Sequence, residues 1–223
     1  MRTPKNPDII QIHKNAPDYP ARLLDLYDPP NSLYICGDIR LFNLPMIAIV
    51  GSRAASPEGI RNAHYFAQAL SAEGYLIISG LAKGIDGAAH QAALSLGKNF
   101  FTLAVCGTGL DLTYPKEHIG LANSISRQGL MISELPLGVG PKPFHFPRRN
   151  RLIAALALGV VVIEAADKSG SLITARVAAD LGREVFALPG PISSPTSSGC
   201  HKLIQQGAKL VCSPKEVLDE LIF

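Results

Sequence analysis

The segment 142–151 holds the side chains that are best suited to bind a polyanion. It combines cations with aromatic rings, namely Lys142, Phe144, Phe146, Arg148, Arg149 and Arg151. No aspartate or glutamate stands between Glu134 and Glu164. Cations neutralise phosphates, and an aromatic ring offers a stacking face worth about 1–3 kcal/mol per base. The segment is therefore typical of a surface that binds a single nucleic-acid strand.

A plainer interpretation of this segment is a solvated face with Phe144 or Phe146 packed in the core. We also expect at least one of its arginines to be structural and to pair with an acid such as Glu134 or Glu164. Because cations near the start of a helix oppose the helix dipole, this is a costly place for them. That cost favours a functional role for the arginines.

Short turns rich in glycine, serine and threonine follow most of the predicted strands. The residues of these turns with the best chemistry for an anion are Gly51, Ser52, Arg53, Lys83, Gly84, Gly107, Ser169, Gly170 and Ser171. Glycine lets the backbone approach an anion, and the free N–H groups at a helix start favour negative charge. Any single turn of this kind also forms simply to join a strand tightly to a helix. Repetition along one edge, with Arg53 and Lys83 adding full charges, favours an anion site.

Signatures of common enzymes and metal sites are missing from the sequence. It has no GxxxxGK[ST] loop, no complete GxGxxG and no GxSxG, and its six histidines lack metal-ligand spacing. The acids near strand ends are Asp86, Asp111, Glu134, Glu164 and Asp167. We expect these acids to cap helices or to pair with arginines. The sequence thus predicts no cofactor, no metal and no catalytic residue.

The elements that must position these residues alternate along the chain from residue 46 onward. Strands are predicted at 46–50, 75–79, 99–105, 130–133, 160–165, 184–188 and 208–211. Helices are predicted at 56–72, 85–96, 116–127, 148–158, 171–181, 201–206 and 214–221. Apolar strands joined by single helices predict a Rossmann-like, doubly wound, mostly parallel α/β sheet with helices on both faces. Ligands of such sheets bind beyond the carboxyl ends of the strands, where the glycine-rich turns lie.

Composition sets the class of protein. With 223 residues, 47% hydrophobic and 17% charged, the chain is expected to form a folded core. A net charge of +3 permits a polyanionic partner without demanding one. The lack of a long apolar run, of a secretion signal and of paired cysteines predicts a cytoplasmic protein with reduced thiols and no membrane contact. Residues 1–45 are predicted to be a proline-rich N-terminal arm with one short helix (21–26) and one short strand (32–36), packed on a core domain of residues 46–223.

Several long motifs together resemble the DprA/Smf family of DNA-processing proteins. They are GSR (51–53), SGLAKGIDGAAH (79–90), GTGLDLTYPKEH (107–118), ISELP (132–136), FPRRNRLIAALA (146–157), EAADKSGSLITA (164–175) and LPGPISSPTSSGCHKLIQQGA (188–208). The sequence departs from the family at His118 and His201, where asparagine is usual. In many members a small helical domain precedes this core and a winged-helix domain follows it, and these 223 residues correspond to the core.

This resemblance implies an extended Rossmann fold that binds single-stranded DNA and helps to load the recombinase RecA onto it during natural transformation. It also implies a homodimer and no enzymatic activity. Carried over to this sequence, Arg53, the PRRNR region and the SGS turn would contact DNA. Together with the turns above, the expected DNA-binding residues are Gly51, Ser52, Arg53, Lys83, Gly84, Gly107, Lys142, Phe146, Arg148, Arg149, Asn150, Ser169, Gly170 and Ser171.

The same sequence features are compatible with two other functions. A nucleotide-processing enzyme on the same fold would bind a free nucleotide at the glycine-rich edge. The PGP at 189–191 argues against it, because relatives of that kind carry a PGGxGT loop. A protein adaptor would bind a recombinase without DNA. The apolar C-terminal segment suggests a dimer surface, although ordinary core packing also accounts for most of its residues.

Overall fold

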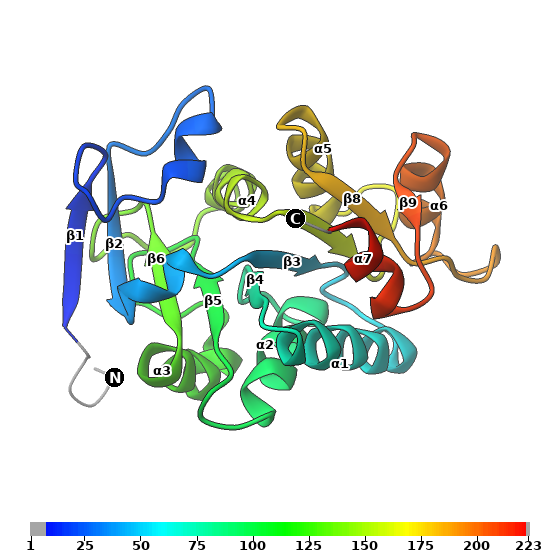
Figure 1. Cartoon of the computed structure of the whole chain (residues 1–223), viewed down its shortest axis with the longest axis horizontal. Coiled ribbons are helices and arrows are strands. Elements are labelled where there is room, and N and C mark those ends of the chain that lie inside the picture. Colours follow the sequence, from blue (N-terminus) through cyan, green and yellow to red (C-terminus); the bar gives the residue numbers. More distant parts are fainter. Residues whose placement is uncertain (1–7, 222–223) are drawn as a thin grey trace.

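The computed structural model describes residues 8–221, which form one nine-stranded sheet with helices on both faces (Figure 1). The strands are β1 (Ile9–His13), β2 (Ser32–Gly37), β3 (Met46–Val50), β4 (Leu76–Ser79), β5 (Thr102–Val105), β6 (Leu130–Ser133), β7 (Gly159–Val162), β8 (Glu184–Ala187) and β9 (Lys209–Leu210). They lie in the order β1-β2-β6-β5-β4-β3-β7-β8-β9. The strands β3 to β9 are parallel, and β2 joins both β1 and β6 antiparallel. The predicted fold class is thereby confirmed.

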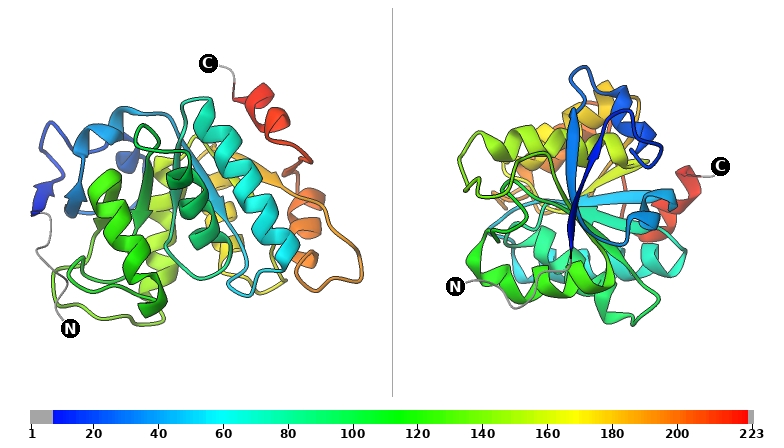
Figure 2. Two further views of the ribbon diagram at one scale, coloured as in Figure 1. Left: turned by 90° about the horizontal axis from the view of Figure 1, so that it is seen from below. Right: turned by 90° about the vertical axis from the view of Figure 1, so that its left-hand side faces the viewer.

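Seven α-helices accompany the sheet within the described residues. They are α1 (Pro57–Ala72), α2 (Ile85–Ser95), α3 (Ile119–Gln128), α4 (His145–Leu156), α5 (Ser171–Asp180), α6 (Ser198–Gln205) and α7 (Pro214–Glu220). Short 3-10 helices are η1 (Ala21–Asp25), η2 (Ile39–Asn43) and η3 (Lys116–His118). Two views at right angles show the helices α1 to α3 on one side of the sheet and α4 and α5 on the other (Figure 2).

The central strands are apolar throughout because both of their faces are covered. In β3, Ile47 and Ile49 pack with α1 and α2, whereas Ala48 and Val50 face the core that includes α4 and α5. Successive side chains of a strand point to opposite faces, so a strand between two helical layers needs apolar residues at every position. This is why MIAIV reads as a continuous apolar run rather than an alternating one.

The N-terminal arm is more regular than the sequence predicts. In addition to η1 and β2, it contains the strand β1, which extends the sheet beyond β2. The prediction missed β1 because its residues are mostly exposed and include two polar side chains, so the strand lacks an apolar run. Because β1 lies at the edge of the sheet and most of its side chains face solvent, it needs few apolar residues.

Element boundaries differ most where prolines and loops intervene. The helix α4 begins at His145 rather than at Arg148, and Pro147 lies inside its first turn. Proline is tolerated there because the N–H groups of the first turn have no acceptor within the helix, so the N–H that proline lacks is not needed. Consequently Arg149 and Arg151 lie in the second turn, not the first. The predicted strand 99–105 is shortened to β5, and the predicted helix 116–127 divides into η3 and α3.

The strand order reverses between the adjacent strands β3 and β7, which makes this a topological switch point of the sheet. From β3 the chain proceeds through β4 and β5 to β6 on one side, and from β7 through β8 to β9 on the other. A crevice opens beyond the carboxyl ends of two adjacent strands at such a switch point, because their connections leave in opposite directions. None of the helices within residues 8–221 has the length and hydropathy of a membrane span.

Candidate functional site

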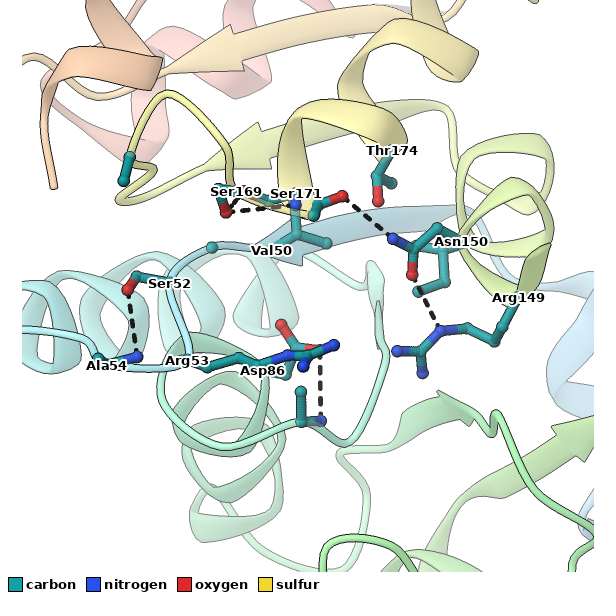
Figure 3. A pocket seen from close by; sticks show the side chains of 15 residues that line it. Val50, Ser52, Arg53, Ala54, Asp86, Arg149, Asn150, Ser169, Ser171 and Thr174 are labelled. Atoms are coloured by element: carbon teal, nitrogen blue, oxygen red, sulfur yellow. Dashed lines mark hydrogen bonds between the residues drawn. The ribbon is translucent and has the colours of Figure 1, made fainter. Parts of the chain in front are cut away.

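A cavity of about 370 Å³ occupies this crevice between β3 and β7 (Figure 3). Its walls come from the β3–α1 turn, the β4–α2 turn, α4 and the β7–α5 turn. The predicted residues that line it are Gly51, Ser52, Arg53, Arg149, Asn150, Ser169, Gly170 and Ser171. Segments that are more than a hundred residues apart in the sequence therefore meet here, as the rule for open parallel sheets predicts.

The β7–α5 side of the cavity presents hydroxyl groups at a helix start. Ser171 is the first residue of α5, and its hydroxyl lies 2.7 Å from that of Ser169. The N–H groups of Ser171, Leu172 and Ile173 already donate to the hydroxyl and carbonyl of Ser169 and to the Gly170 carbonyl. What this side offers is its hydroxyl groups and the positive end of the helix dipole. This side of the cavity therefore suits a phosphate oxygen, which accepts hydrogen bonds.

Arg53 extends from the β3–α1 turn into the crevice (Figure 3). It also lines a second cavity of about 360 Å³, whose wall includes Tyr114, Lys142, Phe146 and Asn150. The guanidinium carbon of Arg53 lies 5.3 Å from the centroid of the Phe146 ring, within the range of a cation–π contact. The two cavities share Arg53, Asn150 and Gly170, so they form one continuous depression.

Tyr114 is a residue of this site that the sequence reasoning missed. Its ring centroid lies 5.4 Å from that of Phe146, and its side chain is exposed. It stands in the loop after β5, next to Pro115. The signal that was available is an aromatic residue in a glycine-rich turn that follows a strand, the same position that drew attention to Arg53.

Lys83 and Gly107 line a small cavity of about 80 Å³ that also contains Arg53, Phe146 and Arg149. Lys83 is exposed, and its Nζ lies 2.5 Å from a carboxylate oxygen of Glu117. This pairing lowers the pKa of Glu117. Lys83 therefore stands at the rim of the site, with part of its charge already neutralised.

The three cations Arg148, Arg149 and Arg151 do not share one environment. Arg148 is exposed and pairs with Glu134 at 2.9 Å, outside the three cavities. Arg151 pairs with the other oxygen of Glu134 and donates to the Asp28 carbonyl at 2.5 Å. The expectation that an arginine of this segment pairs with a strand-end acid is confirmed, for two arginines and one acid.

Arg149 is only 4% exposed, in contrast to its neighbours. Its guanidinium donates to the backbone carbonyls of Gly80 and Val105 and, through Nε, to Asn150 Oδ1 at 3.0 Å. Burial lowers the pKa of Arg149, while the charge of the nearby Asp86 opposes this effect. The arginine lies in the floor of the site rather than on its surface.

Three other strand-end acids accept hydrogen bonds from neighbouring turns or from a helix start. Glu164 accepts hydrogen bonds from the backbone N–H and the hydroxyl of Ser56, at 2.9 and 2.5 Å, and so reinforces the cap of α1. Asp86 accepts from the N–H groups of Gly80 and Ala82, and Asp111 accepts from that of Gly138. Within residues 8–221, no three histidines, cysteines or acids gather in a way that could hold a metal ion.

Several of the predicted glycines allow close packing within the site. A Cβ at Gly84 would lie 2.2 Å from the Ser52 carbonyl oxygen, and its φ of +73° also favours glycine. A Cβ at Gly107 would lie 2.9 Å from a ring carbon of Phe146. Gly84 thus brings the β4–α2 turn against the β3–α1 turn, and Gly107 makes room for the aromatic ring.

Comparison with known proteins places the chain in a family. The model described as DNA recombination-mediator protein A matches residues 10–222. Protein Smf of Escherichia coli is 50% identical over 220 residues, which cover 98% of this chain and 58% of that protein. The DNA processing protein DprA of Streptococcus pneumoniae is 50% identical over 205 residues, covering 92% of this chain and 72% of that protein. The chain thus spans somewhat more than half of the Escherichia coli relative.

Solved structures agree with this assignment. The X-ray structure of DprA from Streptococcus pneumoniae matches with a TM-score of 0.92 and 46% identity, covering 96% of this chain and 75% of that one. A structure of DprA from Helicobacter pylori, which concerns the single-stranded DNA binding mode of that protein, matches with a TM-score of 0.86 and 29% identity over 97% of this chain and 98% of that one. Because the family model spans nearly the whole sequence and relatives share half of its residues, this chain belongs to the DNA recombination-mediator protein A family, as its resemblance to the DprA/Smf proteins predicted.

Proposed function

We propose that this chain binds single-stranded DNA in the depression around Arg53 and performs no chemistry on it. The observation that carries the proposal is the sharing of Arg53 and Asn150 by two adjoining cavities, one rich in hydroxyl groups and one walled by Phe146 and Tyr114. The hydroxyl-rich cavity suits a phosphate, and the aromatic wall suits a base. A nucleotide of a flexible strand carries both a phosphate and a base.

Electrostatics supports an anion in this place. The pKa of Arg149 is lowered first by burial, and the like charge of Arg53 lowers it further. A phosphate near both cations would relieve the repulsion between them, and the start of α5 would add the positive end of its dipole. Lys142, which lines the second cavity, adds a further cation.

The strand would be bound without regard to sequence. Every base has a face that stacks on an aromatic ring, and the phosphates are identical along the strand. The DprA of Helicobacter pylori, whose structure concerns binding of single-stranded DNA, has the same fold as this chain.

As a recombination mediator, the chain would deliver the bound strand to the recombinase RecA. The family to which it belongs supports this role. A strand held in a shallow groove keeps part of its bases accessible to a second protein. Measuring RecA filament growth on strands coated with single-strand-binding protein tests the delivery, and no acceleration by the chain would contradict it.

The chain is also proposed to act as a homodimer in the cytoplasm. Most of the C-terminal apolar residues are buried within the monomer, including Val211, Val217 and Leu221. Leu210 is 44% exposed and lies on β9, at the edge of the sheet, beside a groove between α5 and α6. Light scattering should give a dimer mass for the chain and a monomer mass for Leu210→Glu. Ile222 lies outside the described residues.

A titration with a fluorescent dT oligonucleotide tests strand binding. We expect tight binding at low salt that weakens steeply as salt rises, because each neutralised phosphate releases counterions. Equal affinity at low and high salt would contradict the proposal. Strong thermal stabilisation by a mononucleotide, without strand binding, would instead favour a nucleotide-processing enzyme.

A charge reversal at Arg53 locates the binding surface. Arg53→Glu should lower the affinity far more than Arg61→Glu, since Arg61 is an exposed cation on α1 that lines none of the three cavities. Equal losses for both variants would refute the assignment of the site. A pull-down of RecA with and without oligonucleotide separates strand delivery from a protein adaptor that needs no DNA.

A further inference from the structure

Arg149 connects α4 to the ends of two strands. Its Nη1 donates to the carbonyl oxygens of Gly80, directly after β4, and of Val105, the last residue of β5. A Cβ at Gly80 would lie only 2.4 Å from the guanidinium, so the side chain packs directly on the backbone. Hydrogen bonds from a charged donor are roughly twice as strong as neutral ones. The guanidinium therefore fixes α4 relative to β4 and β5.

The turn after β4 is held from its other side by Asp86. This carboxylate is buried and accepts from the backbone N–H groups of Gly80 and Ala82, at 3.1 and 3.3 Å. Burial raises the pKa of Asp86, and the nearby charge of Arg149 counteracts that rise. Asp86 takes the N–H of Gly80 while Arg149 takes its carbonyl, so both polar groups of this residue are satisfied.

Asn150 carries the connection across the crevice. Its Oδ1 accepts from Arg149 Nε at 3.0 Å, and its Nδ2 donates to the Gly170 carbonyl at 3.1 Å (Figure 3). Because the guanidinium has donors only, it dictates which end of the amide faces it. The Nδ2 group must then face Gly170, which immediately precedes α5.

These contacts form a continuous polar chain from the β4–α2 turn through Arg149 and Asn150 to the start of α5. We propose that Arg149 is a positioning residue: it sets the start of α5, with Ser171, at a fixed place opposite Arg53, and it does not itself contact a phosphate. This inference rests on the proposed binding of single-stranded DNA. It reassigns Arg149, expected from the sequence to be a DNA contact, to the support of those contacts.

Salt dependence distinguishes a positioning residue from a phosphate contact. For single strands, the slope of log K against log salt concentration changes by about 0.7 for each phosphate that a protein neutralises. Loss of a phosphate contact therefore lowers both the affinity and the slope. Loss of a positioning residue lowers the affinity at every salt concentration and leaves the slope unchanged.

The experiment measures dT oligonucleotide binding over a range of salt for the whole chain and four variants, Arg53→Gln, Arg149→Lys, Arg149→Gln and Gly80→Ala. Arg53→Gln is the reference for a lost phosphate contact and should reduce the slope by about 0.7. Arg149→Lys keeps the charge, but a compact ammonium lacks the planar fork that reaches two carbonyls and Asn150 at once. It should lower the affinity by about tenfold or more, because charged hydrogen bonds that hold the site are lost, and the slope should stay that of the unmodified chain.

Gly80→Ala is a second variant that leaves every cation in place. The added methyl group would displace the Arg149 guanidinium, so affinity should fall, again with no change of slope. Hydrogen exchange in the free protein supplies an independent readout. Arg149→Lys should speed exchange in the segment that contains Gly170 and Ser171, which Arg149 does not touch and reaches only through Asn150.

Each outcome bears on one proposal. If Arg149→Lys binds dT as tightly as the unmodified chain, or if Arg149→Gln lowers the slope as Arg53→Gln does, Arg149 contacts the strand through its charge and the positioning role is wrong. Unchanged exchange around Gly170 would also overturn it. If the unmodified chain binds no dT oligonucleotide, the proposed function fails instead, whatever the variants show.

Discussion

The Arg53 guanidinium lies over the ring of Phe146, with its carbon 5.3 Å from the ring centroid, and both residues line the same cavity. The arginine comes from the turn after β3 and the ring from the first turn of α4. The positive charge of Arg53 and the aromatic face of Phe146 are therefore adjacent. A nucleotide needs both, a cation for its phosphate and a flat surface for its base. Tyr114 also contacts the ring, with the two ring centroids 5.4 Å apart and the ring planes tilted by 40°.

The first prediction concerns the stacking role of this ring. Phe146→Leu keeps an apolar side chain but removes the flat π-face, so the free energy of dT binding should weaken by about 1–3 kcal/mol. A fluorescence titration at one salt concentration measures this change. Phe144→Leu is the matched control, because Phe144 is 64% exposed and does not line the three cavities. An equal loss for both variants would remove the special role of Phe146.

The second prediction uses the close approach at Gly107. An alanine Cβ there would lie 2.9 Å from a ring carbon of Phe146, too near for an ordinary contact. Gly107→Ala should therefore shift the ring and weaken binding of dT, although it removes no charge and no aromatic group. Gly120→Ala serves as control, since a Cβ at Gly120 meets nothing within 4 Å. Unaltered affinity for Gly107→Ala would show that the ring position does not matter.

The third prediction concerns the free energy of unfolding. The Glu134 side chain is 7% exposed and pairs with both Arg148 and Arg151. Glu134→Gln leaves Arg151 largely buried without its charge partner, so unfolding in urea should become easier by about 1–3 kcal/mol. Glu117→Gln breaks an exposed pair with Lys83 and should leave the free energy of unfolding almost unchanged, because solvent screens such a pair. If both variants lowered the free energy of unfolding by the same amount, the buried Glu134 pairs would be no more important for stability than the exposed Glu117 pair.

The fourth prediction is a dependence of stability on pH through His90. Its Nδ1 lies 2.7 Å from Thr102 Oγ1, whose hydroxyl proton is donated to the Ile77 carbonyl. The ring must then donate from Nδ1, which leaves its buried Nε2 without a partner among the described residues. Burial, aided by the nearby charges of His118 and Arg149, lowers the pKa of His90 to about 3.

The sign of this effect follows from the neutral ring in the folded protein. Between about pH 6.5 and about pH 3 the unfolded chain binds a proton that the folded chain refuses, so stability is greatest above pH 6.5 and falls as the pH drops. The full effect is about 5 kcal/mol at 1.36 kcal/mol per pH unit. Urea unfolding at about pH 7 and about pH 5 should show a smaller loss for His90→Leu than for the unmodified chain or for the exposed control His13→Leu. If all three proteins lost the same stability between these pH values, His90 would not be the source of the pH dependence.

Much of the architecture was predictable from local patterns. The Ser56-Pro57 helix start, the apolar strands and the glycines after helices indicated the parallel core, and the structure confirms them. The strand β1 was not predictable, because an edge strand with exposed side chains carries no periodic apolar signal. The start of α4 was misplaced because Pro147 reads as a boundary, although proline fits the first turn of a helix.

The sequence by itself determined which residue types gather at the carboxyl edge of the sheet, because the order of strands and turns is a local property of the chain. Only the tertiary structure decided what each does there. Arg148, Arg149 and Arg151 look alike in the sequence, yet one is exposed, one is buried beneath the site and one ties the N-terminal arm to Glu134. The rotation of a helix about its axis separates them, since successive side chains point in directions about 100° apart and only packing against the sheet fixes which of them faces inward.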